Sequence, residues 1–362
     1  MNLNYKFKIK KKVRDILLIS IISLIVLLVL SFFSLFIGSS SMSFNDAFLA
    51  IFNIGDKANI NIIYNIRLPR ILTSLLIGAA LSLSGLILQS ILNNPMASPS
   101  TLGTTNASVL GANLAIIILS GGNIISVTFN YLNSYLISFC SFIFSFLGLL
   151  FILLLSKIKH FKSETMILIG ISLSSLFQAV TTLLQYFAND ISLSSAIYWS
   201  FGNLSRTSYK EIIIIFIPLV ISTIIFQLFY KRLNAISFGD EFAFTSGVNV
   251  ERTKFFFLLL CSIITSLSIC FVGIIGFIGL IAPHIVKKII GHNHKYTIPL
   301  SLIFGALILL ISDDLARVIL NGFSLPVGAI TSILGAPFFL YLILSENRRK
   351  KNAWCYQSFL QL

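Results

Sequence analysis

Long apolar segments separated by short polar segments dominate the pattern along this chain. The run Ile16–Ile37, for example, contains no charged residue and shows no alternation between polar and apolar positions. A helix needs about 20 apolar residues to cross a hydrocarbon core roughly 30 Å thick, whereas the strands of a membrane barrel read as alternating segments of about ten residues. Because lipid offers no hydrogen-bond partner to an open backbone, the pattern predicts transmembrane helices.

Ten segments of this kind predict an all-α integral membrane protein with about ten transmembrane helices. The predicted spans are Ile16–Ile37, Ile71–Leu92, Gly103–Leu119, Leu132–Leu155, Met166–Phe187, Ile212–Leu228, Phe255–Val272, Ile274–Ile290, Ile298–Ile311 and Val327–Leu344. Between the seventh and eighth spans, Gly273 and Gly276 predict a tight turn at membrane depth that the surrounding protein shields from lipid.

Composition and charge agree with this class of protein. Hydrophobic residues make up 56% of the 362 residues and charged residues 10%, whereas soluble domains carry about 25% charged residues. The net charge of +14 does not indicate nucleic-acid binding, because the basic residues lie at the ends of the apolar runs, as topology signals do. We expect the lipid bilayer as a partner and no nucleic acid. The first apolar run is too long for a signal peptide and is interpreted as a retained helix.

The distribution of lysine and arginine predicts the orientation in the membrane. With both termini in the cytoplasm, 20 of the 26 basic residues fall on inner segments, as the positive-inside rule requires. The chain then divides into a basic N-terminal segment (residues 1–15), a single transmembrane domain (residues 16–345) and a basic cytoplasmic tail (residues 346–362).

One of the inner loops, at residues 230–254, is longer than a connection needs. Its stretch Gly239–Gly247 predicts a short helix that ends at Gly247. Asp240 and Glu241 fall in the first turn, where the helix dipole favours negative charge.

Nothing in the sequence indicates catalysis or a bound metal. The four cysteines are scattered without a CxxC pair, and no second histidine stands at metal-ligating spacing from His284. A phosphate-binding GxxxxGK[ST] loop is also absent, so the chain cannot use ATP by that route. We therefore expect no cofactor, no metal site and no catalytic residue, and classify the chain as a non-enzyme.

One face of the second predicted span carries Gly78, Ser82, Gly85 and Gln89. Small residues let helix backbones approach closely in lipid, so packing is sufficient to explain the first three. The amide of Gln89 needs a polar partner, which is either a neighbouring helix or a water-filled path. The turn Asn93–Pro99 that follows is either a simple connection or part of a gate.

Arginines near the outer helix ends also have two interpretations. Arg67, Arg70 and Arg317 could reach lipid headgroups, or they could dock carboxylates of an external protein, since guanidinium groups suit bidentate carboxylate recognition. Arg317 follows Asp313 by four residues, so this pair could also be satisfied within one helix.

Eight motifs, in this order, resemble the permease family of ABC importers for iron–siderophore complexes, haem and vitamin B12, the FecCD type. They are Arg67-Leu68-Pro69-Arg70; Gly85 with Gln89; Asn94-Pro95-Met96-Ala97 with Pro99, Leu102 and Gly103; Trp199 with Gly202; Gly239-Asp240 with Ala243 and Gly247; Gly276-Phe277-Ile278-Gly279-Leu280 with Pro283-His284; Asp313 with Ala316-Arg317; and Leu325-Pro326-Val327-Gly328 with Gly335-Ala336-Pro337-Phe338-Phe339. The resemblance extends from about Asp46 to Leu344.

This resemblance implies an assembly and a set of functional residues. A second permease subunit, identical or homologous, would form the translocation path with this chain. Two cytoplasmic ATPase subunits and an extracytoplasmic substrate-binding protein would complete the importer in the bacterial cytoplasmic membrane. The residues implied are Gly239, Asp240, Glu241, Ala243 and Gly247 for ATPase coupling within a segment at about 236–250; Arg67, Arg70 and Arg317 for docking; and Gln89, Asn94, Pro95, Ser163, Glu164, Pro283 and His284 for the path and gate. The family has small polar residues where this chain has Lys162 and Glu164.

The predicted function is import of ferric-siderophore complexes, with haem or cobalamin as the alternative cargo of the same family. A rival class is an ion-coupled secondary transporter in which Asp190, Asp313 or Asp314 carries protons, although most acidic residues fall in loops or at helix ends. A membrane-embedded enzyme is a further rival, and the chain lacks a catalytic constellation for it.

Overall fold

The computed structural model describes residues 3–38, 42–119, 131–157, 163–320, 324–341 and 344, and every regular element within these ranges is helical. Within these ranges, seven helices are long and apolar enough to cross a membrane. They are Val13–Ser34, Lys57–Ile91, Ser134–Lys157, Ser163–Tyr186, Tyr209–Leu228, Val250–Val272 and His294–Val318. The prediction of a multi-pass all-α membrane protein is thereby confirmed.

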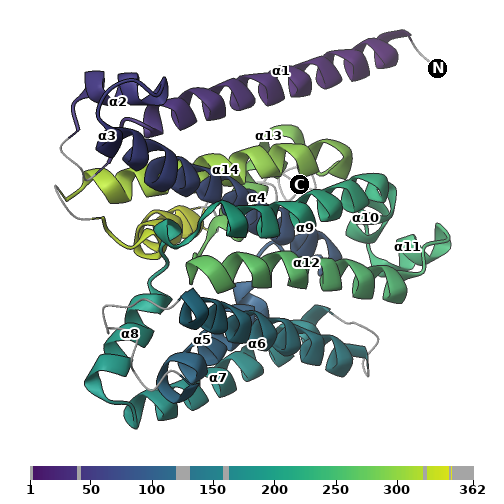
Figure 1. The fold of residues 1–362 in the computed structure, drawn as a ribbon. Helices are drawn as coiled ribbons and strands as arrows, with labels where there is room; N and C mark the ends of the chain where they lie inside the picture. Colours follow the sequence, from purple (N-terminus) through teal and green to yellow (C-terminus); the bar gives the residue numbers. More distant parts are fainter. Residues whose placement is uncertain are drawn as a thin grey trace.

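Three shorter helices occupy the remaining predicted spans. They are Thr104–Leu119, the helix Ile278–Ile290 and the helix Val327–Tyr341. The count of ten spans and the orientation remain predictions. In Figure 1, the N-terminus lies at the same end of the molecule as α10 (Tyr230–Ser237) and α11 (Asp240–Thr245), the helices of the long loop that is predicted to be inner.

The helices other than α10 and α11 carry the following labels in chain order. They are α1 (Leu3–Ser34), α2 (Phe44–Ile51), α3 (Lys57–Ile62), η1 (Ile63–Arg67), α4 (Leu68–Ile91), η2 (Ser100–Leu102), α5 (Thr104–Leu114), η3 (Ala115–Leu119), α6 (Tyr131–Lys157), α7 (Ser163–Tyr186), α8 (Asp190–Ser200), η5 (Leu204–Arg206), α9 (Tyr209–Leu228), α12 (Val250–Val272), α13 (Ile278–Ile290) and α14 (His294–Val318). Polar caps fix several starts: Ser208 and Glu211 form a capping box at α9, and asparagines cap α8, α12 and α14.

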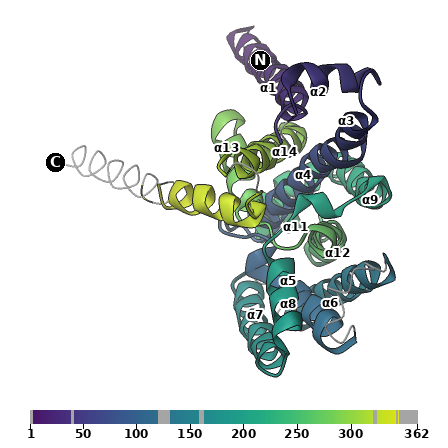
Figure 2. The same cartoon turned by 60° about the vertical axis from the view of Figure 1, so that its left-hand side comes forward.

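The centre of the molecule is α4. Of the residues in its most apolar stretch, 83% are buried, compared with 11% in both α1 and α7. It packs against α14, α13, α12 and α9, while α12 continues the packing to α6 and α5 (Figures 1 and 2). Helices that are more exposed in the single chain therefore surround one helix that is mostly buried.

Small residues explain why α4 can occupy this place. A Cβ added at Gly85 would overlap the carbonyl group of Gly279 in α13, and one added at Gly78 would overlap that of Gly305 in α14. The backbones touch at both points, as small residues permit between helices in lipid. The packing interpretation of this face is confirmed.

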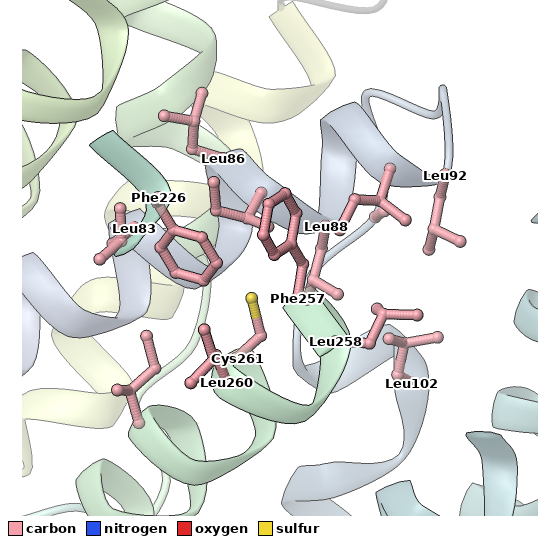
Figure 3. Close-up of a cluster of buried hydrophobic side chains, with 14 of the residues drawn as sticks. Leu83, Leu86, Leu88, Leu92, Leu102, Phe226, Phe257, Leu258, Leu260 and Cys261 are labelled. Atoms are coloured by element: carbon pink, nitrogen blue, oxygen red, sulfur yellow. The ribbon is translucent and has the colours of Figure 1, made fainter. Parts of the chain in front are cut away.

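Between α4, α9 and α12 lies the largest apolar cluster (Figure 3). Phe257 and Cys261 of α12 point toward Phe226 of α9, with the two phenyl rings edge to face at 5.4 Å. Leu83 and Leu86 of α4 close the cluster. Edge-to-face packing of this kind favours one relative position of the two helices.

The chain turns sharply between α12 and α13. Gly273 has φ 82°, and Phe277, the residue before α13, has φ 66°. The segment is enclosed by protein, because a Cβ at Gly273 would meet the carbonyl of Trp199 and one at Gly328 that of Ile274. This arrangement agrees with the turn that the sequence predicts, but it places the start of the eighth helix at Ile278, four residues later than predicted.

Candidate functional site

The segment implied in ATPase coupling forms the helix that the sequence predicts. Helix α11 runs from Asp240 to Thr245, with Asp240 and Glu241 in its first turn. Gly239 before it has φ 116° and Gly247 after it has φ 79°, conformations that favour glycine. Ala243 is buried and faces the rest of the chain.

Exposed aromatic side chains lie on this helix and just before it. Phe238, Phe242 and Phe244 are 77%, 53% and 75% exposed, and the rings of Phe238 and Phe242 lie 5.6 Å apart. The sequence analysis did not select these residues, although three phenylalanines within seven positions of a polar loop were a usable signal. An exposed apolar cluster at the polar end of a membrane protein indicates a contact surface for another protein.

Helix α10 is tied to the bundle through a buried histidine. The side-chain Oδ1 of Asn234 lies 2.7 Å from Nδ1 of His294 and accepts a hydrogen bond from its backbone N–H at 2.9 Å. The other ring nitrogen of His294 lies 2.6 Å from the hydroxyl of Ser90 in α4. Asn93 also donates to the carbonyl of Ile236 in α10. The end of α4 is therefore linked directly to the helix that precedes the coupling segment.

Gln89 bonds a neighbouring helix. Its Nε2 lies 3.4 Å from the carbonyl oxygens of Gly279 and Leu280, and its Oε1 accepts a hydrogen bond from Nζ of Lys287 at 3.1 Å. All three partners belong to α13. Of the two interpretations of this amide, the contact with a helix is the one that the geometry supports.

The remaining residues implied in the path and gate lie in two places. Asn94 and Pro95 form the turn after α4, where the Oδ1 of Asn94 accepts from the backbone of Met96. Pro283 is buried in α13 and His284 beside it is half-buried. Ser163 and Glu164 begin α7, which packs against α5 and α6. Lys162 lies outside the described residues.

A polar stripe on α7 was missed by the sequence analysis. Ser172, Ser175, Gln178 and Thr182 are all exposed, and their spacing places them along one side of the helix. The three hydroxyl groups donate to carbonyls of their own helix, but within the described part of the chain no side-chain hydrogen bond is made by Gln178. A polar amide facing lipid is unfavourable, so this side of α7 indicates contact with water or with another protein.

At the end of the molecule that the sequence predicts to be outer, Arg70 and Arg317 share one carboxylate. Nε and Nη2 of Arg70 lie 2.9 and 2.8 Å from Asp313, and Nη2 of Arg317 lies 2.9 Å from it. Asp313 has no exposed side-chain area, and the arginine side chains are 9% and 3% exposed. Nη1 of Arg70 also donates to the hydroxyl of Ser205 at 2.9 Å. The ion pair between Asp313 and Arg317 within one helix is thereby confirmed.

The arginines also satisfy the C-terminal end of α1. The last carbonyls of a helix lack partners within it. Here Nη1 of Arg317 lies 3.3 Å from the carbonyl oxygen of Ser34, the last residue of α1, and 2.9 Å from that of Ile37 in the turn that follows. In the same turn, Nη1 of Arg67 lies 2.7 Å from the carbonyl oxygen of Leu35. Ser34 donates to Asp314, which itself pairs with Arg317. Cations at a helix C-terminus are also favoured by its dipole.

The arginines are therefore not available at the surface as the docking interpretation expects. Arg67, Arg70 and Arg317 are 4%, 7% and 5% exposed. The physical reason is that two aspartates and the end of α1 enclose their guanidinium groups. The docking role implied by the resemblance remains a prediction. Among the described residues, no group of three or more His, Cys, Asp or Glu side chains could hold a metal ion.

Comparison with known proteins decides the family. The model of the FecCD transport family matches residues 26–345. The chain belongs to the FecCD transport family. Over 349 residues it is 43% identical to MJ0087 of Methanocaldococcus jannaschii, an ABC transporter permease by name, covering 95% of this chain and 98% of that protein. Over 290 residues it is 33% identical to the hemin transport system permease protein HmuU of Yersinia pestis, covering 79% and 84% of the two chains.

A solved structure agrees with this assignment. An inward-facing metal-chelate type ABC transporter matches 90% of this FecCD chain and 99% of its own, with a TM-score of 0.77 and 30% identity. Other relatives, 31 to 33% identical, are named as permeases of Fe(3+)-citrate, molybdate and cobalamin import systems. This FecCD protein is a multi-pass membrane permease of the ABC importer type, and the names of its relatives span several cargoes.

Proposed function

We propose that this chain is the membrane-spanning permease subunit of an ATP-driven importer that moves ferric-siderophore complexes into the cytoplasm. The observation that carries the proposal is the exposed aromatic helix α11 at the end of the molecule where the N-terminus lies. The chain has no nucleotide-binding loop, so energy from ATP must arrive through a contact with another subunit. We assign that contact to α11.

The partners follow from this assignment. Two cytoplasmic ATPase subunits bind the α11 helices of two permease subunits, and an extracytoplasmic binding protein delivers the cargo. Closure of the ATPases on ATP then moves α11 and rocks the helices, so that the path opens to one side at a time. The permease itself makes and breaks no covalent bond.

Phe242→Glu should disconnect the permease from its ATPase. A carboxylate in place of a ring that becomes buried between two proteins would be desolvated without a partner. We expect at least tenfold less ATPase to co-purify with the permease. Uptake of ⁵⁵Fe(III)–ferrichrome and ⁵⁵Fe(III)–enterobactin, measured with the assembled importer in cells, should fall to background for whichever of the two is the substrate.

Phe52→Glu is the matched control. Phe52 is 61% exposed and its ring lies 5.2 Å from that of Phe48, but it belongs to the opposite end of the molecule, next to α2. This variant should keep the ATPase bound. Undiminished ATPase binding by Phe242→Glu would refute the assignment of α11. Transport of haemin or cyanocobalamin, with no uptake of either iron complex by the unaltered protein, would replace the cargo by one of the two alternatives.

The translocation path is assigned to the polar side of α7, facing a second permease subunit. Along this side, Ser172, Ser175, Gln178 and Thr182 carry no charge, which suits a large complex held weakly better than a small oxyanion that would need cationic ligands. The relative that is named for molybdate import is for this reason a poorer guide to the cargo than those named for iron chelates.

Cysteine accessibility should separate the two sides of α7. In a cysteine-free background, Ser175→Cys and Gln178→Cys should react with a membrane-impermeant thiol reagent at least tenfold faster than Leu176→Cys. Leu176 is 56% exposed and serves as the control for a side chain that faces lipid, where thiolate is not formed. Equal rates at Leu176 and Ser175 would contradict this assignment of the path.

The rival ion-coupled transporter has less support. Asp313 already accepts from Arg70 and Arg317, and Asp314 from Arg317 and Ser34, which is the arrangement of a structural ion-pair network. Asp190 lies exposed in the first turn of α8. Replacement of the phosphate-loop lysine in the ATPase partner discriminates between the classes, because an ion-coupled carrier would keep its activity.

A further inference from the structure

We propose that the ion pair between Asp240 and Lys254 is the positioning element that transmits movement of the coupling helix α11 to the transmembrane helix α12. The proposal rests on the proposed contact between α11 and an ATPase. It assigns to these two residues a role in coupling ATP hydrolysis to transport, as distinct from a role in binding the ATPase.

Lys254 occupies an unusual place for a lysine. It lies one turn into α12, its side chain is 1% exposed, and its Nζ is 2.6 Å from Oδ2 of Asp240. An ammonium group is strongly disfavoured away from water unless a carboxylate pairs with it, so the position of this side chain depends on Asp240. The carboxylate of Asp240, at the first residue of α11, is 47% exposed.

Few other contacts hold α11 to α12. Ala243 is its one buried residue, and Phe242 and Phe244 point away from the chain. At both flanking glycines, Gly239 and Gly247, a Cβ would meet nothing within 4 Å, so the backbone there is uncrowded. A short helix between two such glycines can change its angle easily. The pair of Asp240 with Lys254 is therefore the strong directional link between α11 and α12.

From Lys254 the link continues into the core. Phe257, Leu258 and Cys261 follow it on α12 and pack against Phe226 of α9 and the leucines of α4 (Figure 3). Protein interiors are close-packed, so a shift of the first turn of α12 is passed on to the helices against which it packs. Helix α12 also packs against α6 and α5, next to the helix to which we assign the path.

Helix α10, which precedes α11, is attached to a different part of the bundle from α11. On the other side of Gly239, Asn234 of α10 is held by His294, which contacts Ser90 of α4. Neutral hydrogen bonds thus fix α10 to α4 and α14, while an ion pair fixes α11 to α12. A push on α11 therefore acts on α12 relative to α4. Because the link between α11 and α12 consists of the single ion pair of Asp240 with Lys254, a substitution can remove it without changing the aromatic surface to which we assign ATPase binding.

The test uses the complete importer, with its ATPase and binding protein, in proteoliposomes. Asp240→Asn should keep the co-purified ATPase and its hydrolysis rate within twofold of wild type but lower the cargo transported per ATP at least tenfold. Asp15→Asn is the control, because it removes the acidic partner from the exposed pair of Arg14 with Asp15, whose side chains are 71% and 52% exposed. That variant should stay within twofold in every measurement.

The double variant Asp240→Asn/Lys254→Met separates coupling from folding. Replacing both partners of a buried pair by neutral groups is often tolerated by the fold. We expect the midpoint temperature of its thermal unfolding to lie closer to wild type than that of Asp240→Asn. The cargo transported per ATP should stay at least tenfold below wild type. Recovery of transport to within twofold would overturn the proposal, since the pair would then serve the fold only.

Two further outcomes also overturn it. Transport per ATP within twofold of wild type in Asp240→Asn would show that the pair transmits nothing. Loss of the ATPase from Asp240→Asn would make Asp240 a contact residue. Failure of the proposed function is detected separately, because Phe242→Glu would then leave ATPase binding intact whatever Asp240 does.

Discussion

Replacement of Asp313 by asparagine should lower the free energy of unfolding by about 3 to 5 kcal/mol, which is the cost of leaving a buried charge without its partner. The carboxylate of Asp313 is fully buried and pairs with both Arg70 and Arg317. An asparagine is nearly the same size but is neutral, and it leaves two guanidinium groups facing each other. The loss extends to the end of α1, because Arg317 also donates to the carbonyl of Ser34, the last residue of that helix, and to the carbonyl of Ile37 just beyond it.

Thermal unfolding of the detergent-solubilised protein, followed by size-exclusion fluorescence, measures this effect. Asp190→Asn is the control. Asp190 is exposed in the first turn of α8, where a carboxylate contributes about 0.3 to 1 kcal/mol through the helix dipole. A melting temperature for Asp313→Asn equal to that of Asp190→Asn would show that the network contributes little to stability.

Substitutions of the buried arginines test stability as well as docking of a binding protein. A variant such as Arg67→Glu combined with Arg317→Glu places new negative charges beside Asp313 and Asp314 and beside the carbonyls that end α1. It should unfold the end of the molecule that holds this network, so a loss of uptake would not by itself report on a binding protein. If docking does use these arginines, the carboxylates of the binding protein must compete with Asp313 and Asp314 for the same guanidinium groups.

Gly85→Ala should also destabilise the protein strongly. The added methyl group would overlap the carbonyl group of Gly279. The atoms it would meet belong to the backbone of α13, so they cannot move aside as the end of a flexible side chain would. Overpacking costs typically about 1 to 3 kcal/mol and more when the backbone must shift, and we expect the upper end of this range. The expected consequence is that α13 separates from α4, which also breaks the contacts of Gln89 with Gly279 and Leu280.

The matched control is Gly276→Ala, at a glycine of the family motif that also contains Gly279. A Cβ at Gly276 would lie 3.4 Å from the hydroxyl of Ser332, an ordinary contact, and its φ is not in the left-handed region. We expect normal amounts of this variant in the membrane and a sharp loss of Gly85→Ala, compared by blot and by melting temperature. Equal behaviour of the two variants would contradict the close approach of α4 and α13.

Particular elements show what could be predicted from the sequence. The predicted helix after Gly239 was found, because two glycines and two first-turn acids are local signals that need no tertiary partner. The turn at Gly273 was also found, although α13 begins later than predicted. The helix that includes the predicted second span begins at Lys57, well before the predicted start at Ile71, because a run with several asparagines gives only weak helix signals.

The sequence by itself determined that this protein is a multi-pass helical membrane protein and, through eight motifs, which family it belongs to. Apolar runs of about 20 residues allow few other structures, because lipid leaves the backbone no outside partner. Only the tertiary structure decided what the polar residues do. Arg70 is 243 positions from Asp313, and Gln89 is 190 from Gly279, so no local pattern could show that these groups satisfy each other. In a low-dielectric interior, a polar group takes its role from its nearest partner, and folding chooses that partner.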